Sequence, residues 1–225
     1  MELPEPIIYN IKPTKLIPNS PKPLIHYKGC FLRDGKVDPV LAYDTFKSNG
    51  WDPQWVTRYG SHQRSHYHGQ AHEVMAVLSG PGAIRWGVAD LDDDSDKHTY
   101  GGANEEGSLH MQANVGDVFV IPAGITHKNY NPYTASTRDA TCLTGDAHYI
   151  ESEDPRKLVG ELPLIEFTMI GAYPTGSTWT WEEGGDHVGR YESVWNIPNP
   201  VRDPVRGDQG GINKLWRYNG RESNI

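Results

Sequence analysis

Residues 60–80 read GSHQRSHYHGQAHEVMAVLSG and contain histidines and a glutamate at regular spacings. His66 and His68 are separated by one residue, so on a β-strand both imidazoles point to the same face. A turn follows, and a second strand returning beside the first can aim Glu73 at the same place, while its neighbour His72 faces the other way. This stretch predicts a cluster of imidazole and carboxylate side chains.

A second stretch, residues 116–131, reads GDVFVIPAGITHKNYN. A β-branched strand runs into a Pro-x-Gly turn, and His127 emerges just after the turn on the returning strand. Imidazoles together with a carboxylate suit iron, manganese, nickel, copper or zinc. We therefore expect one divalent transition metal, with the ligands His66, His68, Glu73 and His127. Three neutral imidazoles and one carboxylate leave a net charge of +1, and an octahedral ion keeps two positions for water, dioxygen or a chelating substrate.

Both stretches match known motif spacings. The first resembles the first motif of the cupin superfamily: Gly60, five residues, His66-x-His68, four residues, Glu73, six residues, Gly80. The second resembles the second cupin motif: Gly116, five residues, Pro122-x-Gly124, two residues, His127, three residues, Asn131. Further segments resemble a branch of small bacterial and fungal cupins that largely lacks assigned activity: residues 17–21, 66–74, 171–174, 203–205 and 215–216. The resemblance implies a cupin β-barrel, also called a double-stranded β-helix or jelly roll, together with its metal site and a homodimer.

The composition is consistent with one all-β domain. A chain of 225 residues with 24 Gly and 17 Pro has many turns. We expect residues 1–54 to form an arm and a short helix on the barrel, residues 55–175 to form the barrel, and residues 176–225 to form a loop-rich extension. Strands are predicted at 55–59, 64–68, 73–78, 83–88, 117–121, 126–130 and 164–174. The proline-rich segment 7–25 is expected to wrap the outside.

Helices are expected to be few. Asp38 is a candidate N-cap followed by Pro39, and Gly50 is a candidate C-terminal stop, which predicts a helix over 38–50. A second short helix is predicted near 154–158, inside a long irregular insertion at 132–163 of the kind that often forms lids or binding loops.

Charge and composition exclude several classes of protein. The formal net charge of -8 argues against nucleic acid as a partner. The sequence has no apolar run of membrane-spanning length, and its start lacks the features of a signal peptide, so we expect a soluble, cytoplasmic protein. Cys30 and Cys142 are expected to be reduced thiols. The acidic run 90–96 fails the calcium-loop pattern and is interpreted as a solvated loop.

Other residues have competing interpretations. Glu73 and His72 are candidate catalytic residues that could move a proton, although strand alternation disfavours His72. His62, Met75 and Asn129 are candidate substrate contacts, with a rim hydrogen bond as the alternative for His62 and core packing as the alternative for Met75. Four tryptophans either stack on an aromatic ligand or pack structurally: Trp86, Trp179, Trp181 and Trp195.

Three functions are compatible with this pattern. The first is a metal-dependent enzyme that acts on a small oxygenated organic molecule, with oxygenase or oxidase chemistry by family analogy. The second is a metal-dependent isomerase, decarboxylase or dehydratase, in which the metal polarises the substrate. The third is a non-catalytic cupin that binds a small molecule, suggested by the lack of a clear acid-base group beyond the ligands.

Overall fold

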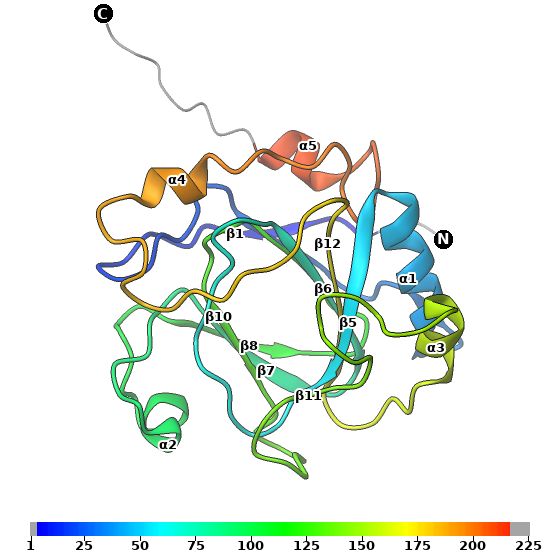
Figure 1. Cartoon of the computed structure of the whole chain (residues 1–225), viewed down its shortest axis with the longest axis horizontal. Helices are drawn as coiled ribbons and strands as arrows, with labels where there is room; N and C mark the ends of the chain where they lie inside the picture. Colours follow the sequence, from blue (N-terminus) through cyan, green and yellow to red (C-terminus); the bar gives the residue numbers. More distant parts are fainter. Residues whose placement is uncertain (1–3, 217–225) are drawn as a thin grey trace, which may run out of the picture.

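A computed structural model describes residues 4–216 of the chain, which fold into a barrel of two antiparallel sheets (Figure 1). The larger sheet has the order β1 (Ile7–Tyr9), β2 (Leu24–Tyr27), β9 (Val118–Ile121), β6 (Glu73–Ser79), β12 (Thr168–Pro174), β5 (Trp51–Arg58) and β11 (Thr141–Cys142). The smaller sheet has the order β10 (His127–Tyr130), β7 (Gly82–Trp86) and β8 (Leu109–Ala113). A separate ribbon pairs β3 (Leu32–Arg33) with β4 (Lys36–Val37). The predicted all-β cupin barrel is confirmed.

The larger sheet is buried on both faces. Along β6, Met75 and Val77 point into the barrel, where they pack with residues of both sheets. Val74 and Ala76 point outward into a second core that lies under the helices. Because both faces are covered, the strand has a nearly continuous apolar sequence instead of a polar alternation. Glu73 has the same parity as Met75 and therefore points into the barrel.

α1 (Pro39–Ser48) covers part of the outside of the larger sheet, where it contacts β5 and β12. α1 begins after Asp38, whose side chain accepts hydrogen bonds from the backbone N–H groups of Val40 and Leu41. The predicted N-cap and helix are thus confirmed. α3 (Pro155–Glu161) lies beside α1, and it confirms the second predicted helix (Figure 1). The remaining helices are α2 (Ser95–Thr99), α4 (Tyr191–Trp195) and α5 (Gly211–Leu215).

The N-terminal segment differs from the expectation. Residues 7–25 were predicted to wrap the outside, but β1 and β2 extend the larger sheet, and all four residues of β2 are buried. The prolines lie between these strands or before them, so they remove no donor that the ladder needs. The barrel therefore includes chain well before residue 55.

Residues 64–68 also differ from the expectation. Instead of a continuous strand they form two isolated bridges, His66 with His127 and Tyr67 with Glu182. Successive residues of this segment still point to opposite sides, so His66 and His68 face the same side, as predicted. The partner of Tyr67 comes from the C-terminal extension, which sequence periodicity does not connect to this segment.

The C-terminal extension, described as far as residue 216, is fastened to the barrel by a buried carboxylate. Asp203 accepts a hydrogen bond of 2.8 Å from the Tyr27 hydroxyl and further bonds from the backbone N–H groups of Val205 and Arg206. Cys30 and Cys142 are free thiols, as predicted. Within residues 4–216, every helix is too short or too polar to cross a membrane.

Candidate metal centre

Three histidines meet in the barrel interior. Two backbone hydrogen bonds join His66 to His127, from His66 N–H to the His127 carbonyl at 3.0 Å and from His127 N–H to the His66 carbonyl at 2.8 Å. This bridge places the segment that contains His66 and His68 alongside β10. One ring nitrogen from each of His66, His68 and His127 lies within 4.8 Å of the others, and all three side chains are buried. Tyr67, between the first two, points the other way.

Glu73 approaches these histidines from the facing sheet. It is the first residue of β6, and its Oε1 lies 3.2 Å from His68 Nε2 while its Oε2 lies 3.4 Å from His127 Nε2. The sequence predicted that the strand of Glu73 would lie beside the segment of His66 and His68, but β6 belongs to the opposite sheet. The four side chains still converge as predicted, because Glu73 reaches the histidines across the barrel interior.

The rings are held in one tautomer by backbone carbonyls. Nδ1 of His66 donates to the Arg64 carbonyl at 3.1 Å, and Nδ1 of His127 donates to the Ile125 carbonyl at 3.4 Å. Nδ1 of His68 donates to the Thr180 carbonyl. A carbonyl oxygen only accepts, so each Nδ1 carries the proton. In the neutral rings, Nε2 then offers a lone pair to the shared space, which is the usual arrangement of metal-binding histidines.

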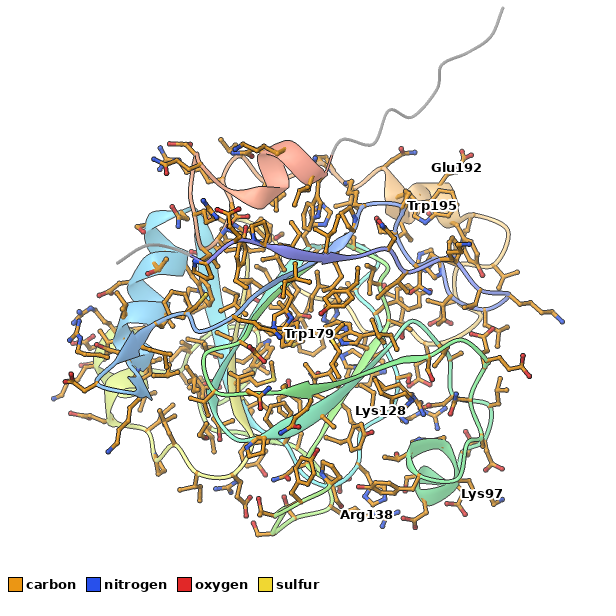
Figure 2. The ribbon with its side chains drawn as sticks, turned by 180° about the vertical axis from the view of Figure 1, so that it is seen from behind. Lys97, Lys128, Arg138, Trp179, Glu192 and Trp195 are labelled. Carbon is orange, nitrogen blue, oxygen red and sulfur yellow. The ribbon has the colours of Figure 1, made fainter. Side chains whose placement is uncertain are left out.

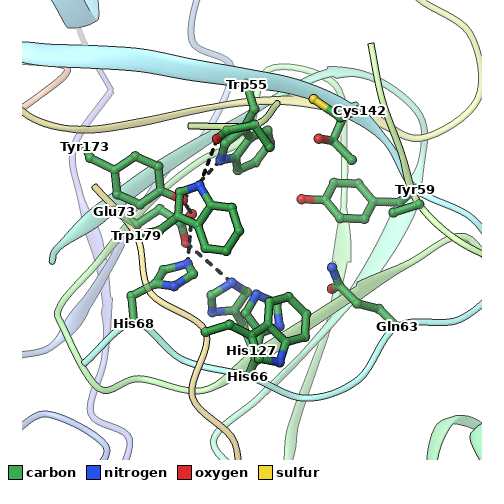
Figure 3. A pocket seen from close by; sticks show the side chains of 14 residues that line it. Trp55, Tyr59, Gln63, His66, His68, Glu73, His127, Cys142, Tyr173 and Trp179 are labelled. Atoms are coloured by element: carbon green, nitrogen blue, oxygen red, sulfur yellow. Dashed lines mark hydrogen bonds and ion pairs between the residues drawn. The ribbon is translucent and has the colours of Figure 1, made fainter. Parts of the chain in front are cut away.

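The carboxylate of Glu73 has one satisfied oxygen and one unsatisfied oxygen. Oε1 accepts a hydrogen bond from the Tyr173 hydroxyl, which itself accepts a 3.1 Å bond from Trp55 Nε1 (Figure 3). Oε2 is buried and has no hydrogen-bond partner within residues 4–216. Buried polar atoms are normally paired, and a divalent cation would satisfy this oxygen together with the three Nε2 atoms. The donor set therefore fits a divalent transition metal.

Burial sets the protonation of these groups. It lowers the pKa of His66 and of His127 to about 3, so both rings are neutral. Burial also acts to raise the pKa of Glu73, but His68, His127 and Tyr173 outweigh it and hold that pKa below its usual value. Burial lowers the pKa of His68, yet the Glu73 carboxylate raises it overall. A bound cation would take the place of the proton that His68 and Glu73 otherwise share.

A cavity of about 220 Å³ opens onto the four side chains (Figure 3). Its lining is mostly aromatic and comes from both cupin motifs, β5, the 132–163 insertion and the C-terminal extension. The residues that complete it are Trp55, Thr57, Tyr59, Gln63, Ala140, Cys142, Ala147, Tyr173, Trp179 and Trp181. The Trp181 indole stacks on His66 with ring centroids 3.7 Å apart. Trp179 and Trp181, which could equally have been packing residues, thus face the cavity.

Comparison with known proteins agrees with this geometry. A family model described as Cupin matches residues 56–151, which include all four side chains. Residues 56–151 thus belong to the cupin superfamily. This cupin is 24% identical over 204 residues to the uncharacterized protein YjlB of Bacillus subtilis (strain 168), covering 89% of this chain and 90% of that protein.

Solved structures with a similar fold are remote. They include the capsular polysaccharide assembling protein CapF from Staphylococcus aureus, at 12% identity and a TM-score of 0.28, with 76% of this chain and 28% of that chain covered. Oxalate decarboxylase of Bacillus subtilis, with Mn(II) centres, has 9% identity and a TM-score of 0.28, with 78% and 30% covered. Vicilin from Corylus avellana (hazelnut) has 10% identity and a TM-score of 0.28, with 78% and 34% covered. The chain spans about a third of the length of each of these proteins.

The other candidate site residues lie outside the cavity lining. His72 faces away from the centre, as strand parity predicted: Nδ1 accepts from the Ala123 N–H at 2.9 Å, and Nε2 donates to the Pro198 carbonyl at 3.1 Å. Because both of its ring nitrogens hydrogen-bond to backbone groups, His72 has a structural role and does not take part in the cluster of His66, His68, Glu73 and His127. His62 makes a rim hydrogen bond to Asp96 at 2.8 Å.

Met75 and Asn129 are neighbours in the barrel interior. The Asn129 side-chain amide lies 3.4 Å from Met75 Sδ, and the Asn129 backbone N–H donates to Gln63 Oε1 at 2.6 Å. Neither residue lines the cavity. Gln63 does, so the contact that Asn129 makes with the site passes through Gln63.

The acidic run 90–96 contains a buried charge that the sequence interpretation placed in solvent. The Asp90 carboxylate is 2% exposed; it forms an ion pair with Arg85 of β7 and accepts from Lys128 Nζ of β10 at 2.8 Å. It also accepts from the Ser65 backbone N–H at 2.8 Å. Burial lowers the pKa of Lys128 to about 8, and Asp90 opposes that shift. Asp93, by contrast, is fully exposed, as predicted for the run.

Asp90 connects both histidine-bearing segments. Its partner Ser65 precedes His66, and its partner Lys128 follows His127. The Lys128 side chain points away from the cavity, into the layer between β10 and the loop that leads to α2 (Figure 2). Strand alternation thus puts the metal donors on one face of β10 and the buried ion cluster on the other. The sequence signal for a buried partner of Asp90 was the presence of single basic residues, Arg85 and Lys128, within segments that otherwise resemble strands.

Asp90→Ala is expected to lower the free energy of unfolding by about 3–5 kcal/mol, because it leaves two buried cations without their shared carboxylate. Chemical denaturation measures this. Asp93→Ala is the matched control; its carboxylate is exposed and pairs only with the partly exposed Arg64, so we expect a change within about 0.5 kcal/mol. Equal effects of the two substitutions would contradict the anchoring role of Asp90.

Tyr173→Phe is expected to weaken divalent-metal binding about tenfold, because Glu73 loses the hydroxyl that fixes Oε1 and directs Oε2 toward the histidines. Competition with a chromogenic chelator measures the affinity. Tyr191→Phe is the control: its hydroxyl bonds the Lys15 carbonyl, far from the cavity. Unchanged metal affinity in Tyr173→Phe would show that this hydroxyl does not position the carboxylate.

Proposed function

We propose that this cupin is a metal-dependent enzyme that acts on a small oxygenated organic molecule by oxygenase or oxidase chemistry. The observation that carries the proposal is the set of three tautomer-fixed imidazoles around the unpaired Oε2 of Glu73, at the floor of a cavity that admits a small molecule. Buried donors beside a cavity are typical of catalytic metal sites.

Each residue has a defined task in this proposal. His66, His68 and His127 present Nε2 atoms that their backbone hydrogen bonds keep in place. Glu73 supplies one negative charge, and the Tyr173 hydroxyl holds its carboxylate in one orientation. A divalent transition metal held there would supply Lewis acidity and, when it is redox-active, electron transfer with dioxygen. The four donor side chains are buried, which strengthens electrostatic interactions between them.

The alternatives differ in what they consume. An isomerase, decarboxylase or dehydratase needs only polarisation of the substrate and takes up no dioxygen, whereas a non-catalytic cupin binds its ligand and returns it unchanged. The Tyr59 and Tyr173 hydroxyls line the cavity, and burial together with the Glu73 charge raises the pKa of both far above neutrality. Such groups are weak acids and bases at neutral pH. Proton transfer by these two hydroxyls is therefore disfavoured.

We also propose that the protein forms a homodimer and works in the cytoplasm. β1 lies at one edge of the larger sheet, and its Ile7 and Ile8 are exposed, so this edge can add a strand from a second copy. The two free thiols fit a reducing compartment.

Metal-loaded protein is expected to consume oxygen with at least one member of a panel of phenols, dicarbonyls and organic acids. Oxygen uptake and product analysis measure this after loading with iron, manganese, nickel or copper. The double substitution His66→Ala, His68→Ala is expected to abolish turnover, because two of the donors are lost. Turnover that survives in the double variant would contradict a metal-centred reaction, and product formation without oxygen uptake would contradict the oxygenase assignment.

A control separates lost chemistry from lost folding. His110→Ala removes an exposed histidine that is outside the donor set and outside the cavity lining and hydrogen-bonds Ser108, so metal content and turnover should persist. Circular dichroism of each variant confirms that the barrel is retained.

A further inference from the structure

We propose that the cavity selects a planar, monocyclic aromatic hydroxy compound, such as a phenol or catechol, over aliphatic diols and over dianionic acids. This substrate class rests on the proposed metal-dependent function and makes it more specific. It follows from the shape, charge and size of the space in front of the donors.

Aromatic side chains form much of the cavity wall, and two of them stack on neighbouring rings. Trp181 lies parallel to the His66 ring, with an interplanar angle of 5°. Trp179 stacks on His148 with ring centroids 4.1 Å apart, and its Nε1 donates to the Ala147 carbonyl at 2.8 Å. Figure 3 shows Trp179 in front of the four donors, with Trp55 and Tyr59 on other sides of the space. Flat, rigid walls of this kind favour a flat ring, which stacks on them or meets them edge to face.

The lining contains one formal charge. Glu73 is the charged residue among those that line the cavity, and Lys and Arg are absent from that set. With a divalent cation and three neutral imidazoles, the centre has a net charge of +1, which one phenolate oxygen balances. A dianion would keep one charge without a basic side chain to pair with it, which is costly in a water-poor site. Charge therefore favours a neutral ligand that binds as a monoanion.

The size of the cavity suits one ring. A protein cavity of about 150 Å³ is sufficient to bind benzene. The 220 Å³ available here leaves room for a single ring with a few substituents. This excludes large polycyclic compounds from the enclosed part of the site.

Polar groups away from the histidines provide an anchor for the far side of such a ring. Gln63 Oε1 is occupied by the Asn129 N–H at 2.6 Å, and its Nε2 has no hydrogen-bond partner in the described part of the chain, so it remains a donor. Figure 3 shows this amide and the Tyr59 hydroxyl directed into the cavity. They can hydrogen-bond a ring substituent while a hydroxyl group lies at the donors.

Binding to the zinc-loaded protein tests the selection. Zinc is redox-inert, so the ligand is not consumed. Isothermal titration with catechol, cis-cyclohexane-1,2-diol and oxalate compares a planar ring, a non-planar diol with the same donor atoms, and a dianion without a ring. Catechol is expected to bind about tenfold more tightly than either of the other two, which is the range that aromatic contacts contribute. Equal or tighter binding of the diol or of oxalate would overturn the proposal.

Tryptophan variants test the wall directly. Trp179→Ala is expected to remove most of the preference for catechol over the diol, while Trp179→Phe retains it, because an aromatic face remains. Trp195→Ala is the matched control: Trp195 lies on α4, at the periphery of the molecule, and donates to the Pro18 carbonyl (Figure 2). A preference unchanged in Trp179→Ala would contradict the role of this wall.

The zinc content of each sample separates the two proposals. If the wild-type protein, which has all four donor side chains, does not bind zinc, the result contradicts the metal-dependent function and, with it, the substrate class. Stoichiometric zinc binding together with a preference for oxalate would contradict the substrate class alone and leave the metal centre intact.

Discussion

The pair of backbone hydrogen bonds between His66 and His127 is the constraint on which the site depends. It fastens an irregular segment, which has no strand ladder of its own, to the first residue of β10. The alternation of side chains then turns His66, His68 and His127 toward the barrel interior. Glu73 comes from the opposite sheet, so the packing of the two sheets brings it to the histidines. The four donors thus meet only when the whole barrel is closed.

The centre carries a cost that the surrounding structure offsets. An ionised carboxylate with an unpaired oxygen is buried among apolar and aromatic side chains, which disfavours folding unless the charge is compensated. Tyr173 compensates one oxygen, and the imidazoles lie against both. On the far face of β10, the cluster around Asp90 holds the neighbouring residues in place. Sites at which a fold tolerates such unsatisfied groups are often functional sites.

The sequence predicted the four side chains because each lies in one of two short motifs. His66 and His68 share parity, Glu73 and His127 each begin a strand beside a turn, and the cupin resemblance implied that the two motifs meet. The aromatic wall was not predictable in the same way. Trp179 and Trp181 reach the cavity only because Glu182 pairs with Tyr67, a contact between segments more than a hundred residues apart in the chain.

Other features depended on packing that periodicity does not encode. Tyr173 lies on the same face of β12 as Gly171, against which Trp55 packs, and only the structure shows that this face is turned toward Glu73. Asp90 looked like part of an exposed acidic run because Arg85 and Lys128, its partners, lie on separate strands. β2 was mistaken for an outer arm since the prolines before it suggested an irregular segment.

The central claim is that these four side chains hold one metal ion between the two sheets. The most direct measurement is anomalous diffraction from crystals of the metal-loaded protein, recorded at the absorption edge of the loaded metal. We predict one anomalous peak within coordination distance of Nε2 of His66, His68 and His127 and of the Glu73 carboxylate. A peak at another place, or no peak at this one in crystals of protein that contains stoichiometric metal, would contradict the account.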